Sequence, residues 1–222
     1  GASGRVRYVP VDVSAAYLRG IKERLAGEYP GLEVVPVAAD IAGAFEIRTS
    51  LPRPALFAFL GSTIGNFEPE AGAALMGRLR SAMRPEDRLL LGVDLKKDVA
   101  LIEAAYNDAA GVTAAFNLNM LRVLNRRLGA DFDPAGYEHR AFYNAERGRV
   151  EMHLVARRAQ VVTIPGTGVF RLDVGESIRT EVSYKYDRRD VEALLEAGGL
   201  RLEGWRTDAE GRFALVTARA AA

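Results

Sequence analysis

The sequence contains no cysteine and only two histidines, His139 and His153, among its 222 residues. Without cysteine the chain forms neither a disulfide nor a thiolate zinc site, and two histidines are too few for a histidine-rich metal centre. We therefore expect no metal. Neither histidine has an obvious carboxylate partner at close spacing, so structural roles are expected for both.

An excess of one charge is also lacking, because 30 Lys and Arg nearly balance 29 Asp and Glu. Arginine pairs such as Arg126-Arg127 are scattered, which does not favour a surface that follows nucleic-acid phosphates. Apolar runs end within about eight residues, whereas a membrane helix needs roughly 20, and the first residues lack the apolar core of a signal peptide. We expect no nucleic-acid partner, no membrane partner and a cytoplasmic location.

What the first hundred residues do contain is an alternation of short apolar runs with segments of helical periodicity. Strands are expected at 7–13, 32–40, 54–61 and 88–95, and helices at 14–29, with Ser14 as N-cap, and 70–83. This alternation predicts an α/β fold with a mostly parallel, doubly wound sheet.

The rest of the chain changes period twice. Residues 97–130 predict helices that cover the sheet, and 141–164 alternate like antiparallel strands, with turns at 146–148 and 165–166. A helix at 186–199 and strands at 200–208 and 211–219 end the chain. We divide it into a core at 1–98, a helical and antiparallel lobe at 99–185, and a return to the core at 186–222.

Carboxylates end three of the expected strands, where ligands of open α/β sheets bind. Asp12 could accept hydrogen bonds from ribose hydroxyls, or it could form an Asx turn before the helix. Asp40 could accept from an adenine amine or simply form a turn. For Asp94, beside two lysines, a solvated charged turn is expected.

The loop GSTIGN, Gly61 to Asn66, follows the third strand. Its glycines would let the backbone approach a ligand, and Thr63 and Asn66 offer polar groups, which suits a zwitterionic small molecule. A plain turn is the alternative. The lysine of a phosphate-binding loop is absent.

Glu181 and Ser183 lie two residues apart, so an extended segment would turn both to one side. Together they could bind an imidazole or a similar heterocycle, although polar residues on an exposed strand are the alternative. Tyr106 and Phe116 lie in the helical segment, where an aromatic is more typical of a core than of a pocket.

Six segments stand out when they are taken together: FLGSTIGNF, LLLGVDLKKD, AAYND, GVTAAFNLNML, RVEMHL and GESIRTEVSYKY. They resemble one family, the S-adenosylmethionine-dependent histidine Nα-methyltransferases of ergothioneine biosynthesis, and the likeness covers essentially the whole chain. The resemblance implies a Rossmann-like class I methyltransferase sheet with a small α+β substrate-binding lobe. It implies S-adenosylmethionine as cofactor and L-histidine as substrate, methylated three times on its α-amine without a covalent nucleophile.

The resemblance also implies roles for individual residues. Asp12 would hold the cofactor ribose, and Asp40 with Ile41 would border the adenine. The substrate pocket would be lined by Gly61, Thr63, Asn66, Tyr106, Phe116, Met152, Glu181 and Ser183. Within it, Asn66 and Tyr106 would grip the carboxylate, Glu181 and Ser183 would bind the imidazole, and Met152 would pack against the ring.

One family feature is absent from the sequence, namely the Gly-rich turn E-x-G-x-G after the first strand. The substrate-contacting tyrosines that the family places before it are absent too. We therefore expect the chain to lack an N-terminal portion and to be a monomer once that portion is present. The alternative function is a non-catalytic amino-acid-binding module without a complete cofactor site.

Overall fold

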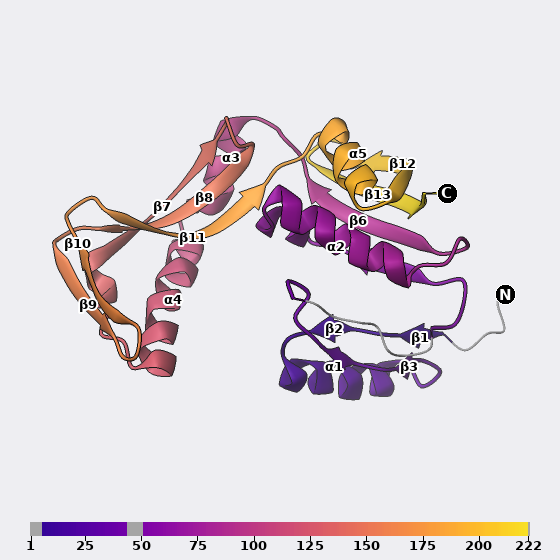
Figure 1. The fold of residues 1–222 in the computed structure, drawn as a ribbon, viewed down its shortest axis with the longest axis horizontal. Coiled ribbons are helices and arrows are strands. Elements are labelled where there is room, and N and C mark those ends of the chain that lie inside the picture. Colours follow the sequence, from indigo (N-terminus) through magenta and orange to yellow (C-terminus); the bar gives the residue numbers. More distant parts are fainter. Residues whose placement is uncertain (1–5, 44–50, 222) are drawn as a thin grey trace.

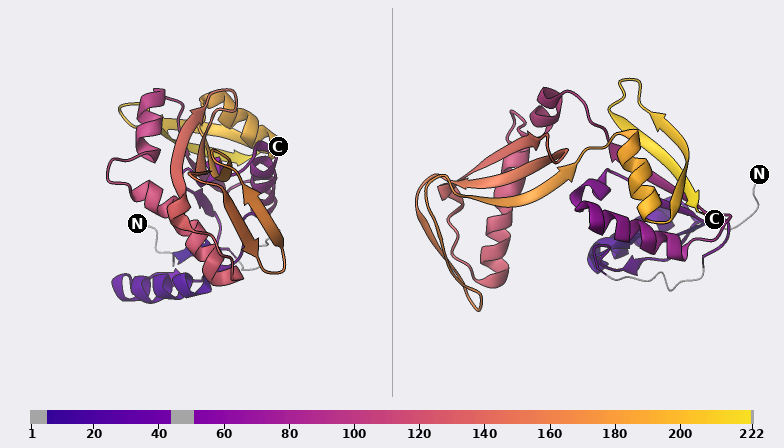
Figure 2. Two further views of the ribbon diagram at one scale, coloured as in Figure 1. Left: turned by 90° about the vertical axis from the view of Figure 1, so that its left-hand side faces the viewer. Right: turned by 45° about the horizontal axis from the view of Figure 1, so that its top comes forward.

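The computed structural model describes residues 6–43 and 51–221. They form a core lobe and a small lobe that lie side by side (Figure 1). Two connecting segments join the lobes, and the right-hand view of Figure 2 shows the same arrangement. None of the helices within the described ranges is both long and apolar enough to cross a membrane.

The core lobe is built on a four-stranded sheet in the order β12-β13-β6-β5. Its strands are β5 (Leu56–Phe59), β6 (Arg88–Asp94), β12 (Leu200–Thr207) and β13 (Phe213–Ala220). β5 and β6 are parallel, and β13 is antiparallel to both of its neighbours. The predicted βαβ order and the closing antiparallel strand are therefore confirmed.

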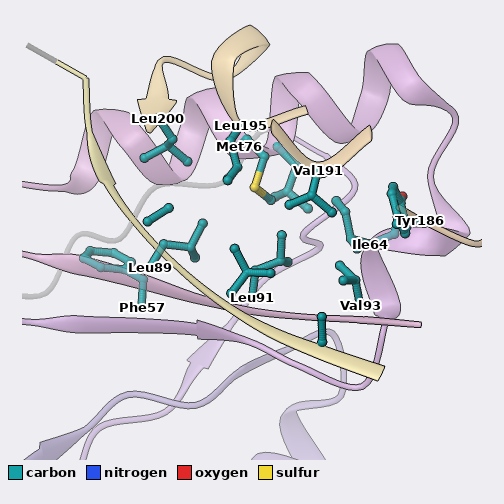
Figure 3. Packing of buried hydrophobic residues seen from close by; sticks show 14 of the residues in the cluster. Phe57, Ile64, Met76, Leu89, Leu91, Val93, Tyr186, Val191, Leu195 and Leu200 are labelled. Carbon is teal, nitrogen blue, oxygen red and sulfur yellow. The ribbon is translucent and has the colours of Figure 1, made fainter. Parts of the chain in front are cut away.

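Two helices, α2 (Pro69–Ala82) and α5 (Arg188–Ala197), pack on one face of this sheet (Figure 3). Leu89, Leu91 and Val93 alternate along β6 and are fully buried. They pack in one cluster with Met76 of α2 and Leu195 of α5. Burial of this apolar cluster is the main force that holds the helices to the sheet.

The remaining core strands form two short parallel ladders. β1 (Arg7–Tyr8) pairs with β3 (Glu33–Val34), and β2 (Val11–Asp12) pairs with β4 (Val37–Ala38). The sequence predicted one strand in each place, but Pro10 and Pro36 divide them because proline has no N–H to donate. Among the described residues, neither ladder is hydrogen-bonded to the four-stranded sheet.

Helix α1 (Ala15–Glu28) connects the ladders, and its N-cap is Ser14, as predicted. The Ser14 hydroxyl accepts a hydrogen bond from the Tyr17 N–H at 3.2 Å. This bond satisfies one of the free donors of the first helical turn.

The small lobe has a three-stranded antiparallel sheet in the order β11-β8-β7 and a separate hairpin of β9 and β10. The strands are β7 (Tyr137–Asn144), β8 (Arg149–Ala156), β9 (Gln160–Ile164), β10 (Gly168–Leu172) and β11 (Ser177–Tyr184). The predicted turns at 146–148 and 165–166 join β7 to β8 and β9 to β10.

Helices α3 (Val99–Tyr106) and α4 (Val112–Leu128) pack on this small sheet. Ile102 of α3 is buried with Val150 of β8, and Leu121 of α4 is buried with Leu154. The prediction that these helices cover the main sheet was therefore wrong. Their apolar stripes show that they cover a sheet but do not show which one.

The two connections between the lobes run alongside each other. The Tyr186 N–H donates to the Asp94 carbonyl at 3.0 Å, and the Lys96 N–H donates to the Tyr186 carbonyl at 2.9 Å. A parallel bridge pairs Leu95 with Tyr186. The end of β6 and the end of β11 are thereby held side by side.

Candidate functional site

A buried lysine lies where the two lobes meet. Lys185 is 3% exposed and follows β11 directly. Its ammonium lies 2.8 Å from an Asp94 carboxylate oxygen and donates to the Tyr106 hydroxyl at 2.8 Å and to the Ser183 hydroxyl at 3.0 Å. The group also lies 4.8 Å from the centre of the Tyr106 ring. The cluster joins β6, α3 and β11.

Lys185 was not among the site residues predicted from the sequence, although a signal for it was present. Lys185 continues the two-residue spacing of Glu181 and Ser183. Residues at that spacing share one face of an extended segment. A lysine on the face that carries two candidate ligand-binding residues was the missed signal.

Asp94 was expected in a solvated turn, and that expectation was wrong. Its side chain is 22% exposed and pairs with both Lys185 and Lys97. The buried ammonium of Lys185 needs an opposite charge, and Asp94 supplies it.

The loop after β5 contacts the end of β11. It contains the short 3-10 helix η1 (Thr63–Asn66). A Cβ on Gly65 would lie 2.8 Å from the Tyr184 carbonyl oxygen and 3.5 Å from the Ser183 hydroxyl. The close approach that Gly65 permits is therefore to β11.

The other polar residues of the loop face different neighbours. Gly61 and Ser62 both have left-handed backbone angles. The Ser62 hydroxyl accepts from the Asp94 N–H at 2.9 Å, and the Thr63 hydroxyl donates to the Leu60 carbonyl at 3.1 Å. Asn66 is exposed at the end of η1. The loop is thus tied to β6 and β11, with the Asn66 amide open to solvent.

Glu181 and Ser183 lie on the same face of β11, as their spacing predicted. Glu181 is paired with Met152 of β8, and Ser183 is paired with Val150. Ser183 is buried and Glu181 is half-buried. Burial raises the pKa of the Glu181 carboxyl above its ordinary value, and the positive charge of Lys185 opposes this shift.

The two apolar candidates occupy different environments. Met152 is 3% exposed and is buried with Ile102, against which Tyr106 also packs. Phe116 is 66% exposed on α4, so it is not part of the core. An exposed aromatic ring on this helix is available to a ligand or a covering segment.

The candidate cofactor residues lie at the carboxyl ends of β2 and β4, the two paired strands of one parallel ladder. The Asp12 carboxylate accepts from the Ser14 N–H at 2.7 Å, and the Asp40 carboxylate accepts from the Ala42 N–H at 2.9 Å. Both therefore form Asx turns. The Asp12 carbonyl accepts from the Ala39 N–H at 3.0 Å, which brings the two strand ends together. Ile41 is half-buried, and its carbonyl accepts from Arg78 at 3.1 Å.

The two histidines are held in hydrogen-bond networks. His139 Nε2 lies 2.8 Å from the Tyr106 carbonyl, and Nδ1 lies 3.0 Å from the Asn117 amide nitrogen. His139 thus supports the backbone of Tyr106. His153 Nε2 lies 3.2 Å from Glu151, so the expectation that it has no carboxylate partner was wrong.

A second charged network lies around Arg149, which is fully buried on β8. Its guanidinium donates to Glu151 at 2.9 Å, to Glu68 at 2.8 Å and to the Tyr184 hydroxyl at 2.8 Å. Since Glu68 is the N-cap residue of α2, the network ties the small lobe to the core lobe. No signal in the sequence pointed to this pairing.

A cavity of about 360 Å³ lies between α2, α5 and the β7–β8 turn. Its lining includes Phe67, Tyr184, Tyr186 and Leu194 and none of the residues predicted to bind ligand. Lys185 also lines the cavity, so the cavity reaches the buried lysine that donates to the Ser183 hydroxyl.

Comparisons with known proteins show one matching family and a similar relative. The sequence profile of a family described as histidine-specific, SAM-dependent methyltransferase matches residues 1–220. A histidine N-alpha-methyltransferase of Mycolicibacterium smegmatis is 43% identical over 215 residues. That alignment covers 96% of this chain and 66% of the relative. The chain therefore spans just under two thirds of the length of that relative.

One further relative and one solved structure are also similar to this chain. Ergothioneine biosynthesis protein 1 of Schizosaccharomyces pombe is 26% identical over 208 residues, covering 89% of this chain and 26% of that protein. The solved structure of the CcbJ methyltransferase from Streptomyces caelestis superposes with a TM-score of 0.54 at 16% identity. It covers 96% of this chain and 74% of that one. This structural similarity confirms the predicted methyltransferase fold.

Proposed function

Since the chain belongs to the family of histidine-specific, SAM-dependent methyltransferases, we propose that it transfers methyl groups from S-adenosylmethionine to the α-amine of L-histidine. Three successive transfers give Nα,Nα,Nα-trimethylhistidine, or hercynine, for ergothioneine biosynthesis. The names of the bacterial and fungal relatives support this assignment.

The observation that carries the proposal is the position of Glu181 and Ser183 on one face of β11. That face lies beside the loop after β5 and beside Tyr106 of α3. A carboxylate and a hydroxyl side by side match the N–H and the lone pair of an imidazole. Substrates without these groups would leave buried polar atoms unpaired and bind more weakly.

The remaining residues receive roles in the same proposal. Asn66 and Tyr106 hold the substrate carboxylate, and Gly61, Thr63, Phe116 and Met152 line the pocket. Residues 1–98 and 186–222 contribute the cofactor side, and 99–185 contribute the substrate side. A monomeric state and a cytoplasmic location remain predictions.

The carboxyl end of the β2–β4 ladder fits the cofactor. Asp12 and Asp40 end neighbouring strands, and carboxylates at such strand ends accept hydrogen bonds from ribose hydroxyls and amines. We assign Asp12 to the ribose, and Asp40 with Ile41 to the adenine. When bound, S-adenosylmethionine supplies an electrophilic methyl group on a sulfonium.

The protein's part in the reaction is to orient the amine and exclude water. With the cofactor bound, the neutral α-amine of histidine would form the new N–C bond as the C–S bond breaks, with S-adenosylhomocysteine as the leaving group and the positive charge passing from sulfur to nitrogen. Before each of the three attacks the α-ammonium would have to release one proton to water. Positioning by residues that hold the carboxylate and the imidazole supplies the rate gain that comes from proximity.

A calorimetric titration of the purified protein with histidine and with S-adenosylhomocysteine tests the proposal. We expect both to bind. We also expect Glu181→Ala to lower the preference for histidine over phenylalanine by about 10-fold or more, because the imidazole N–H loses its acceptor. Binding of histidine alone would favour the amino-acid-binding module. An unchanged preference in the variant would overturn the assignment of Glu181.

A further inference from the structure

Asn66 is held in place by the chain on either side of it. It ends η1 and is exposed, and its side chain has no hydrogen-bond partner among the described residues. Just before it, Gly65 lies so close to β11 that an added Cβ would be 2.8 Å from the Tyr184 carbonyl oxygen. Just after it, the Phe67 N–H donates to the Ile64 carbonyl at 3.2 Å and closes the short helix. The contacts of the next residue therefore bear on where Asn66 lies.

That next residue, Glu68, is bound by side chains of the small lobe. Its carboxylate accepts from the Arg149 guanidinium at 2.8 and 3.0 Å and from the Tyr184 hydroxyl at 2.5 Å. The Arg179 guanidinium lies 3.8 Å away. The hydrogen bond from Tyr184 lowers the pKa of the Glu68 carboxyl, so the group is ionised at neutral pH. Three side chains from β8 and β11 thus meet at one carboxylate of the core lobe.

Tyr184 links this carboxylate to the strand that carries the candidate imidazole site. Its hydroxyl accepts from Arg149 at 2.8 Å and donates to Glu68, so both of its hydrogen-bonding roles are used. Tyr184 lies between Ser183 and Lys185, and side chains alternate along a strand. The bonds of Glu68 therefore lie behind the face of β11 that carries Ser183.

We propose that Glu68 is a positioning residue for histidine binding, which through Arg149 and Tyr184 holds Asn66 at a fixed place beside the Ser183 face of β11. This inference rests on the proposed function, in which Asn66 binds the substrate carboxylate and that face of β11 binds the imidazole. A fixed span between the two sites lets both ends of histidine bind at once. Glu68 acts through Asn66 and does not contact the substrate.

Glu68→Ala removes these bonds at little cost to the fold. The Glu68 side chain is 45% exposed, so its loss leaves no buried cavity. As the N-cap residue of α2 it makes no capping hydrogen bond with its side chain. Arg149 keeps Glu151 at 2.9 Å, so its buried charge stays paired. Glu68→Gln is the conservative variant, because the amide oxygen can still accept from Arg149.

Calorimetry in the presence of S-adenosylhomocysteine compares histidine with histamine, which has the imidazole and the amine but no carboxylate. The ratio of the two affinities measures what the carboxylate contributes. In the unaltered protein we expect histidine to bind about 10- to 100-fold more tightly than histamine. Glu68→Ala should lower this ratio at least about fivefold and change the histamine affinity by less than about twofold, because the face of β11 is unaltered.

Two variants serve as controls. Glu70→Ala removes an exposed carboxylate from the first turn of α2 without touching the small lobe, and Glu68→Gln should restore the bond to Arg149. Both should keep the ratio within about twofold of the unaltered protein. An unchanged ratio in Glu68→Ala would overturn the proposal. Equal losses of histidine and histamine affinity would also overturn it, because they would indicate a general disturbance of the lobes.

A double-mutant cycle tests whether Glu68 acts through Asn66. Asn66→Ala alone should lower the ratio, and adding Glu68→Ala should then lower it no further, because coupled residues are not additive. Additive losses would overturn the proposal and leave the proposed function intact. A ratio that Asn66→Ala leaves unchanged would instead overturn the assignment of Asn66 in the proposed function. Failure of the unaltered protein to bind histidine would overturn the proposed function itself.

Discussion

At the scale of single residues, Glu181 carries a charge that the fold disfavours. Burial raises the pKa of its carboxyl, and the positive charge of Lys185 offsets only part of this increase. A raised folded-state pKa means that the carboxylate lowers stability at a pH above the folded pKa. Below the unfolded value, near 4.5, this cost is absent.

Glu181→Gln should therefore stabilise the protein at pH 7, and the gain should shrink as the pH falls through the raised pKa of Glu181 toward 4.5. Urea unfolding at a series of pH values measures this trend. Asp208→Asn is the control and should have the opposite effect, lowering the stability at pH 7. The reason is that the backbone N–H groups of Phe213 and Arg212 lower the pKa of Asp208. A gain for Glu181→Gln that persists at low pH would contradict the account.

At the scale of elements, the contact between η1 and β11 depends on Gly65. A Cβ there would lie 2.8 Å from the Tyr184 carbonyl oxygen and 3.2 Å from the Tyr184 nitrogen, so one of the two backbones would have to shift. Gly65→Ala should destabilise the protein by about 1–3 kcal/mol through overpacking and should weaken histidine binding.

The matched control is Gly77→Ala in α2, where nothing lies within 4 Å of the added Cβ. Because alanine favours a helix interior over glycine, this variant should gain about 0.5–1 kcal/mol. Thermal unfolding compares the two variants. Equal effects at both positions would show that the η1–β11 contact is looser than the structure indicates.

Most elements could be predicted because their cause is local. The Ser14 cap, the buried run of β6 and the turn at 146–148 each depend on a few neighbouring residues. Which elements distant in the sequence pack against each other could not be predicted in this way. The packing of α3 and α4 on the small sheet and the pairing of Arg149 with Glu68 depend on which surfaces meet after folding.

The candidate site likewise contains one feature with a local cause, which was predicted, and one contact between distant residues, which was not. The common face of Glu181 and Ser183 follows from strand periodicity and was predicted. The pairing of Asp94 with the buried Lys185 joins residues 91 positions apart in the sequence and was not predicted. Roles for Asp12 and Asp40 stay predictions, since each carboxylate is also engaged in an Asx turn.

At the scale of the whole molecule, the proposed site needs both lobes. The loop after β5 belongs to the core lobe, whereas Tyr106 and Ser183 belong to the small lobe. The paired connections at Asp94 and Tyr186 and the Arg149 network hold the lobes together.

The most direct measurement incubates the purified protein with S-adenosylmethionine and an equimolar mixture of the standard amino acids, with products identified by mass spectrometry. The account predicts mono-, di- and trimethylated histidine, with every methyl group on the α-amine and no other amino acid modified. Methylation of a different amino acid, or of the imidazole ring, would contradict it.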